Sequence, residues 1–146
     1  MNRYVTAAFL SLLSASAFAA APAPAKAPAA PKFAIMNSST DALIDTATAT
    51  AVWNSTLTAK VAKLHPVKKL GYISEVNGGF DTNKTCVVVA RAMTSPLKGK
   101  SFSYDPKQTA VAFGSQAAAT PEQCSALAKA KLTEAVQSIA MSLENS

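Results

Sequence analysis

The arrangement of this chain follows from one segment, Thr85-Cys-Val-Val-Val-Ala-Arg-Ala-Met93. It is rich in valine and apolar on both faces apart from Arg91, whereas a half-exposed strand would alternate apolar and polar residues. Valine is branched at its β-carbon and fits a pleated sheet better than a helix. The segment therefore predicts the central strand of a sheet, with the other elements placed around it.

Three shorter strands bounded by turn-forming residues are expected beside it. They are Leu70–Val76, Ser101–Tyr104 and Thr109–Phe113. Asn77-Gly78-Gly79 predicts a turn after the first of them, and Ser95–Lys100 a loop before the second. Asp105-Pro-Lys-Gln108 predicts a hairpin turn that joins the last two.

The last element is predicted to be an amphipathic helix from Thr120 to about Leu143. Thr120-Pro121-Glu122-Gln123 supplies an N-cap, a proline at the first helical position and a capping-box glutamine. The residues that follow in steps of three or four form one apolar stripe. This stripe consists of Cys124, Ala128, Leu132, Ala135, Val136, Ile139 and Leu143.

The segment Thr40–Leu64 predicts a single helix before the strands. Asp41 and Asp45 fall near its start, where negative charge suits the helix dipole. One stripe at helical spacing contains Leu43, Thr46, Thr50, Trp53, Leu57, Val61 and Leu64. His65-Pro66 ends the helix, because the residue before proline is driven out of the helical region.

The two cysteines, Cys86 and Cys124, predict a disulfide. Neither belongs to a Cys-x-x-Cys motif, and Cys86 leads into three valines, an apolar setting that disfavours a thiolate. In an oxidising compartment such a pair is bonded. A redox-active or catalytic thiol is the alternative. The bond would join the last helix to the central strand.

The order of helix, strands and helix predicts an α+β domain over residues 38–146. Its expected core is a three- or four-stranded antiparallel sheet, flanked by the N-terminal and the C-terminal helix. Each helix has one apolar stripe to bury, so the simplest packing has two layers with both helices on one side of the sheet. One disulfide completes the prediction.

Residues 1–19 have the pattern of a cleaved secretory signal. Arg3 precedes an apolar run from Val5 to Phe18, and Ala17-Phe18-Ala19 is a small-x-small cleavage site. The run is shorter than the roughly 20 residues that span a bilayer, so the mature chain is expected to have no membrane span. An uncleaved anchor is the alternative. Residues 20–37, which begin with only Ala, Pro and Lys, predict a disordered tether. The expected localisation is periplasmic or secreted, in a Gram-negative bacterium.

Lysine supplies most of the positive charge. The chain has 14 Lys and Arg against 8 Asp and Glu, a net charge of +6, and loss of Arg3 with the signal leaves +5. A basic protein attracts nucleic acid, anionic polymers or acidic proteins. The candidate binding surface combines lysines with an aromatic residue: Lys60, Lys63, Lys68, Lys69, Tyr72, Lys98, Lys100 and Lys107. A solvated lysine face around core aromatics is the alternative.

The sequence contains no recognisable catalytic or metal-binding pattern. One histidine, His65, beside two paired cysteines is too little for a zinc site. Asp81-Thr82-Asn83 offers one carboxylate, too few for calcium. His65 is a candidate general base for a hydrolase, but no Gly-x-Ser-x-Gly elbow accompanies it. We therefore expect no enzyme and no cofactor.

The expected function is that of an exported, disulfide-bonded, non-enzymatic domain that engages another macromolecule, in the manner of a small inhibitor or immunity protein. A basic module for anionic envelope polymers or nucleic acid is the second hypothesis. A small hydrolase that uses His65 is the third. Salt dependence separates the first two, since contacts driven by lysine charge weaken as salt rises.

Overall fold

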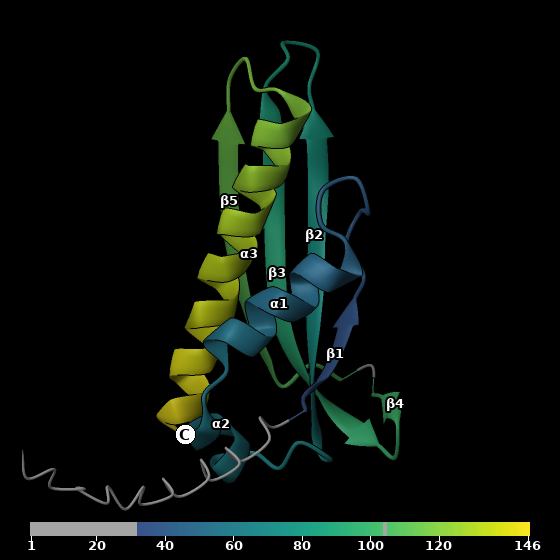
Figure 1. The fold of residues 1–146 in the computed structure, drawn as a ribbon, viewed down its shortest axis with the longest axis vertical. Helices are drawn as coiled ribbons and strands as arrows, with labels where there is room; N and C mark the ends of the chain where they lie inside the picture. The colour runs from purple at the N-terminus through teal and green to yellow at the C-terminus, as the bar shows by residue number, and fades with distance from the viewer. Residues whose placement is uncertain (1–31, 104) are drawn as a thin grey trace, which may run out of the picture.

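The computed structural model describes residues 32–103 and 105–146 and has an α+β fold, as the sequence predicts (Figure 1). Its elements in chain order are β1 (Ala34–Asn37), α1 (Thr46–Thr56), α2 (Ala59–Leu64), β2 (Leu70–Phe80), β3 (Cys86–Lys98), β4 (Ser101–Phe102), β5 (Gln108–Gln116) and α3 (Pro121–Glu144). Residues 1–19, assigned to the signal, and the first part of the expected tether lie outside the described residues.

The sheet has the order β1-β2-β3-β5, with β4 paired to the end of β3. The valine-rich segment is central, because β3 pairs with β2 along one edge and with β5 along the other. All pairs are antiparallel except β1–β2, which is parallel, so the sheet is mixed.

Strand β1 lies in the stretch that the sequence assigns to the tether, so the folded part begins before Ser38. Its four residues pair with β2 from Ala34↔Gly71 to Asn37↔Ser74. Ile35 packs against the core, and the ring of Phe33 meets that of Tyr72 edge-on, with 5.5 Å between centroids. Phe33 and Ile35 follow the Ala/Pro/Lys run and supply the apolar side chains that this segment buries against the core.

The expected turn at Asn77-Gly78-Gly79 is wrong, because β2 continues through it to Phe80. The ladder with β3 extends to Phe80↔Cys86. The turn falls on residues 81–85, where Asp81 Oδ1 accepts hydrogen bonds from the backbone N–H groups of Asn83 and Thr85, both at 2.8 Å. The aspartate therefore closes the turn that the glycines were expected to make.

The hairpin expected between Ser101–Tyr104 and Thr109–Phe113 is also wrong. Strand β5 pairs with β3 over nine register positions, from Cys86↔Gln116 to Thr94↔Gln108, and the short β4 pairs with Leu97 and Lys98. The segment Ser95–Lys100, expected as a loop, contains the last residues of β3. A long central strand offers β5 more partners than the two residues of β4 do.

The first helix is divided in two, because Leu57 and Thr58 leave the helical conformation. Asp45 caps α1 by accepting from the Thr48 N–H at 2.6 Å, and Thr58 caps α2 by accepting from the Val61 N–H. The predicted last helix is confirmed as α3, and its capping box is formed in both directions by Thr120 and Gln123.

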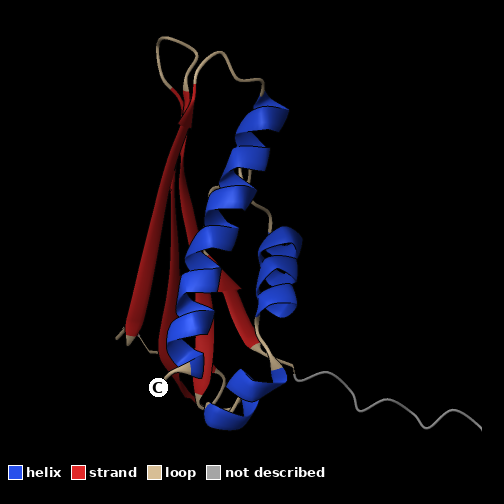
Figure 2. Ribbon diagram, turned by 90° about the vertical axis from the view of Figure 1, so that its left-hand side faces the viewer, coloured by secondary structure: helices blue, strands red, loops and turns tan. Residues whose placement is uncertain are grey.

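The helices cover one face of the sheet, as Figure 2 shows. Trp53 of α1 lies at the centre of this layer, fully buried, and its Nε1 donates to Ser74 Oγ of β2 at 2.8 Å. The Cys86–Cys124 disulfide is present and joins β3 to α3 inside the core. The fold therefore leaves the other face of the sheet uncovered by any described helix.

Candidate functional site

The seven candidate lysines lie at one end of the molecule, which we call the lysine end. Lys60 and Lys63 belong to α2, and Lys68 and Lys69 to the connection that leads into β2. The other three are Lys98, Lys100 and Lys107. Figure 1 shows α2, the start of β2, β4 and the start of β5 at the lower end of the sheet.

Backbone pairing brings these segments together. Strand β2 starts where β3 ends, with Leu70↔Pro96 in register, and the Leu97 N–H donates to the Lys69 carbonyl at 2.9 Å. The Lys107 N–H donates to the Thr94 carbonyl, also at 2.9 Å. Strand register therefore holds Lys69 and Lys107 at this end, whereas Lys60 and Lys63 are carried by α2, which His65 links to the end of α3.

The lysine side chains are exposed and nearly all unpaired. Lys107 forms an ion pair with Asp105, and the other six form none with any residue that the structure describes. Asp105 is the carboxylate side chain in these segments, and Glu144 at the end of α3 lies beside them, where its Oε1 accepts a hydrogen bond from Thr58 Oγ1. Seven lysines against two carboxylates leave this end strongly positive.

Tyr72 is not part of this surface, so its assignment to the binding surface is wrong. It is fully buried on the helix-covered face of β2, against Trp53 at a centroid distance of 5.0 Å. Desolvation by burial raises the pKa of Tyr72 to about 12. The Tyr72 side chain is therefore part of the core and is not accessible to a ligand.

Four of the eight acidic residues lie in the opposite half of the molecule. Asp81 lies in the β2–β3 turn, Glu122 at the start of α3, and Asp41 and Asp45 before α1. The Thr48 backbone N–H lowers the pKa of Asp45, and the pKa of Glu122 is lowered by its own backbone N–H, so both are charged at neutral pH. Lys84 in the same turn and Lys129 and Lys131 in α3 offset most of this negative charge, so the lysine end is the strongly charged end of the molecule.

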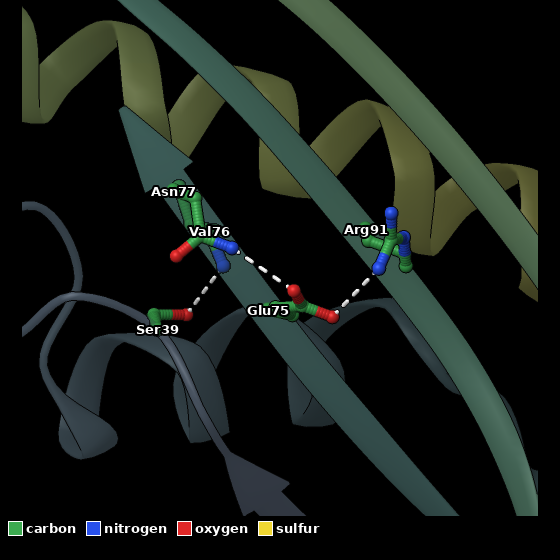
Figure 3. Close-up of polar contacts among 5 residues, drawn as sticks. All are labelled: Ser39, Glu75, Val76, Asn77 and Arg91. Atoms are coloured by element: carbon green, nitrogen blue, oxygen red, sulfur yellow. Dashed lines mark hydrogen bonds and ion pairs between the residues drawn. The ribbon is translucent and has the colours of Figure 1, made fainter. Parts of the chain in front are cut away.

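The uncovered face of the sheet holds a pocket of about 540 Å³ beside the lysine end. It is lined by Met36, Ser38, Ile73, Glu75, Met93, Ser101, Phe102, Ser103 and Pro106. On the same face, Glu75 accepts from Arg91 Nη1 at 3.0 Å and from Asn77 Nδ2 at 2.9 Å (Figure 3). The Ser39 hydroxyl, drawn beside them, accepts from the Val76 N–H at 2.9 Å. Glu75, the charged residue of the pocket lining, is therefore already paired.

His65, the residue of the hydrolase hypothesis, follows α2 and is half-buried. Its Nε2 donates to the Leu143 carbonyl at 3.0 Å, near the C-terminal end of α3. This contact ties α2 to α3, so the geometry gives the imidazole a structural partner.

Among residues 32–103 and 105–146, no three His, Cys, Asp or Glu side chains are grouped so that they could hold a metal ion. No helix in that part of the chain is both long and apolar enough to cross a membrane.

Neither a protein-family model nor a curated protein matches this chain. Among solved structures, it is similar to a PelC point variant from Paraburkholderia phytofirmans, described as a dodecamer. The sequence identity is 10% and the TM-score 0.40, over 75% of this chain and 93% of that one. A likeness at that level carries no argument about function.

Proposed function

We propose that this protein is an exported, non-enzymatic binding domain that holds an anionic polymer at its lysine end. The observation that carries the proposal is the grouping of seven exposed lysines from separate segments at one end, six of them without an ion-pair partner among the described residues. Unpaired lysines gathered at one end of a molecule repel one another, and a polyanion relieves that repulsion by replacing many small counterions.

Lysine chemistry favours a polymer read by its charge and not by its sequence or shape. An ammonium group is a point charge without the planar fork that arginine uses for bidentate recognition of phosphates and bases. The single arginine that remains after signal cleavage, Arg91, is already paired with Glu75 on the sheet face. The lysine end therefore suits repeated sulfate, phosphate or carboxylate groups along a flexible chain.

Export is part of the proposal. The Cys86–Cys124 bond is of the kind that persists in oxidising compartments, and the first 19 residues have the signal pattern. The Ala/Pro/Lys segment adds Lys26 and Lys32, which reinforce the same charge. Anionic polymers of the cell envelope are the partners available in that location.

The test measures binding of the mature protein to fluorescent dextran sulfate and to fluorescent oligothymidylate across a range of salt concentrations. We expect both probes to bind, with affinity falling linearly in log–log form as salt rises. Lys68→Glu with Lys69→Glu should weaken binding at least about tenfold, since each surface lysine contributes on the order of 1 kcal/mol to attraction by an anionic surface.

A matched control changes the same net charge elsewhere. Lys84→Glu with Lys129→Glu alters the β2–β3 turn and the exposed side of α3, and should leave most of the affinity. Equal weakening by the two double variants would show that net charge and not the lysine end is responsible. Salt-insensitive binding to an acidic protein, with no binding to either polymer, would instead favour the inhibitor-like class.

A further inference from the structure

Strand β5 forms an open edge of the sheet. It pairs with β3 on one side, and no strand in the described part of the chain pairs with its other side. Figure 1 shows it at the margin of the sheet. Half of its backbone N–H and C=O groups therefore point outward, ready for another strand.

This edge lacks the features that usually protect edge strands. Its nine residues, Gln108–Gln116, include no charged residue and no proline, and charges or prolines are the common means of preventing pairing with another chain. Val111 and Phe113 are 59% and 62% exposed on the uncovered face. A long, uncharged edge with exposed apolar side chains indicates a strand that has a partner.

The sequence of β5 is nearly symmetric about Ala112. Reading outward from that residue, the pairs are Val111 with Phe113, Ala110 with Gly114, Thr109 with Ser115 and Gln108 with Gln116. Each pair joins residues of the same chemical kind. Two antiparallel copies of one strand, related by a two-fold axis, bring such pairs opposite each other.

We propose that β5 pairs antiparallel with β5 of a second copy of this chain, with the two-fold axis at Ala112. Val111 then lies opposite the partner's Phe113, and Thr109 opposite the partner's Ser115, each twice across the axis. An aromatic ring beside a β-branched side chain and a Thr–Ser pair are both favourable cross-strand combinations. The result is one continuous sheet with both sets of helices on the same side.

The charge distribution agrees with this arrangement. A two-fold axis perpendicular to the sheet reverses the long axis of the second copy. The half that carries Asp81 and Glu122 in one copy then lies beside the lysine end of the other. The two lysine ends are thereby kept apart, whereas a parallel arrangement would place them side by side.

The small residues of β5 point the other way, toward the helices. Ala112 is buried, and a side chain added at Gly114 would meet the Lys131 side chain of α3, with Cε at 2.9 Å. The helix layer is therefore packed closely on this face within each copy. The pairing depends on the strand edge and on the exposed side chains of the other face.

The test is sedimentation equilibrium of the mature protein and of two double variants that introduce charges at exposed positions. We expect the wild type to have twice the monomer mass. Thr109→Lys with Ser115→Lys sets like charges opposite each other twice and should give a monomer. Thr109→Lys with Ser115→Glu sets opposite charges in the same two pairs and should restore the dimer.

Thermal unfolding checks that both variants are folded, and their exposed positions favour this. A wild type that stays monomeric at high micromolar concentration would overturn the proposal. Covering of β5 by the N-terminal segment of the same chain would give this result. It is equally overturned if the two variants have the same oligomeric state, because the register about Ala112 requires them to differ.

Discussion

Tyr72 shows how burial changes the chemistry of one side chain. The ring packs between Phe33 and Trp53, and its hydroxyl is buried with no hydrogen-bond partner among the described residues. Because burial disfavours the phenolate, the pKa of Tyr72 rises to about 12. The hydroxyl therefore contributes little to the free energy of unfolding at neutral pH and lowers that free energy at alkaline pH.

A pH dependence follows. Between about pH 10 and pH 12 the unfolded chain loses the Tyr72 proton while the folded chain keeps it, so the free energy of unfolding falls as pH rises. The loss is on the order of 1–3 kcal/mol. Tyr72→Phe should remove this part of the alkaline loss and cost less than about 1 kcal/mol at neutral pH, because the hydroxyl has no partner to lose.

Urea unfolding of the wild type and of Tyr72→Phe, each at neutral and at alkaline pH, measures the effect. Lysines also titrate in this pH range, but both proteins carry the same lysines. The difference between the two alkaline losses therefore reports Tyr72 alone. Equal alkaline losses in the two proteins would contradict the assignment of Tyr72 to the core.

Local signals predicted single elements well, but not how they pair. Thr120-Pro-Glu-Gln123 starts α3 because its capping contacts lie within one turn, and the valines of β3 need only their own β-propensity. The pairing of β5 with β3 depends on residues far apart in sequence. Tyr72 faces the core because β2 is placed against Trp53, and nothing in its neighbours Lys68 and Lys69 reveals that.

The sequence was enough to identify the residues of the lysine end, but not to show that they lie at one end of the molecule. Six of its lysines occur in three close pairs along the sequence, but only the register of β2 with β3 brings Lys69 beside Leu97. The sequence predicts a hairpin of Thr109–Phe113 with Ser101–Tyr104, whereas β5 pairs with β3 and leaves Val111 and Phe113 exposed. Pairing between residues far apart in sequence therefore explains both the grouping of the lysines at one end and the wrong partner expected for β5.

The disulfide between β3 and α3 is expected to be a major source of stability. It closes a loop with a sequence separation of 38, worth about 4 kcal/mol in the chain-entropy account. Reduction should lower the free energy of unfolding by about that amount, measured by urea unfolding with and without reductant. Cys86→Ala with Cys124→Ala is the control, because reductant should then have no effect. Alkylation of both cysteines without reductant, in protein isolated from cells that make the full chain, would show that the bond does not form in the cell.

The two proposed surfaces are separate and compatible. The lysine end lies at one end of the sheet, and the β5 edge runs along its side. A dimer about Ala112 would present its two lysine ends in opposite directions. Such a dimer could bind two polymer segments at once, which raises overall avidity when both sites are engaged.

The most direct measurement is an amide chemical-shift map of the isotope-labelled mature protein as oligothymidylate or dextran sulfate is added at low salt. The lysine end predicts shifts confined to residues 59–70 and 97–108, which reverse when salt is raised. Shifts centred instead on the β2–β3 turn, on the N-terminal half of α3 or on Val111 and Phe113 would contradict binding at the lysine end.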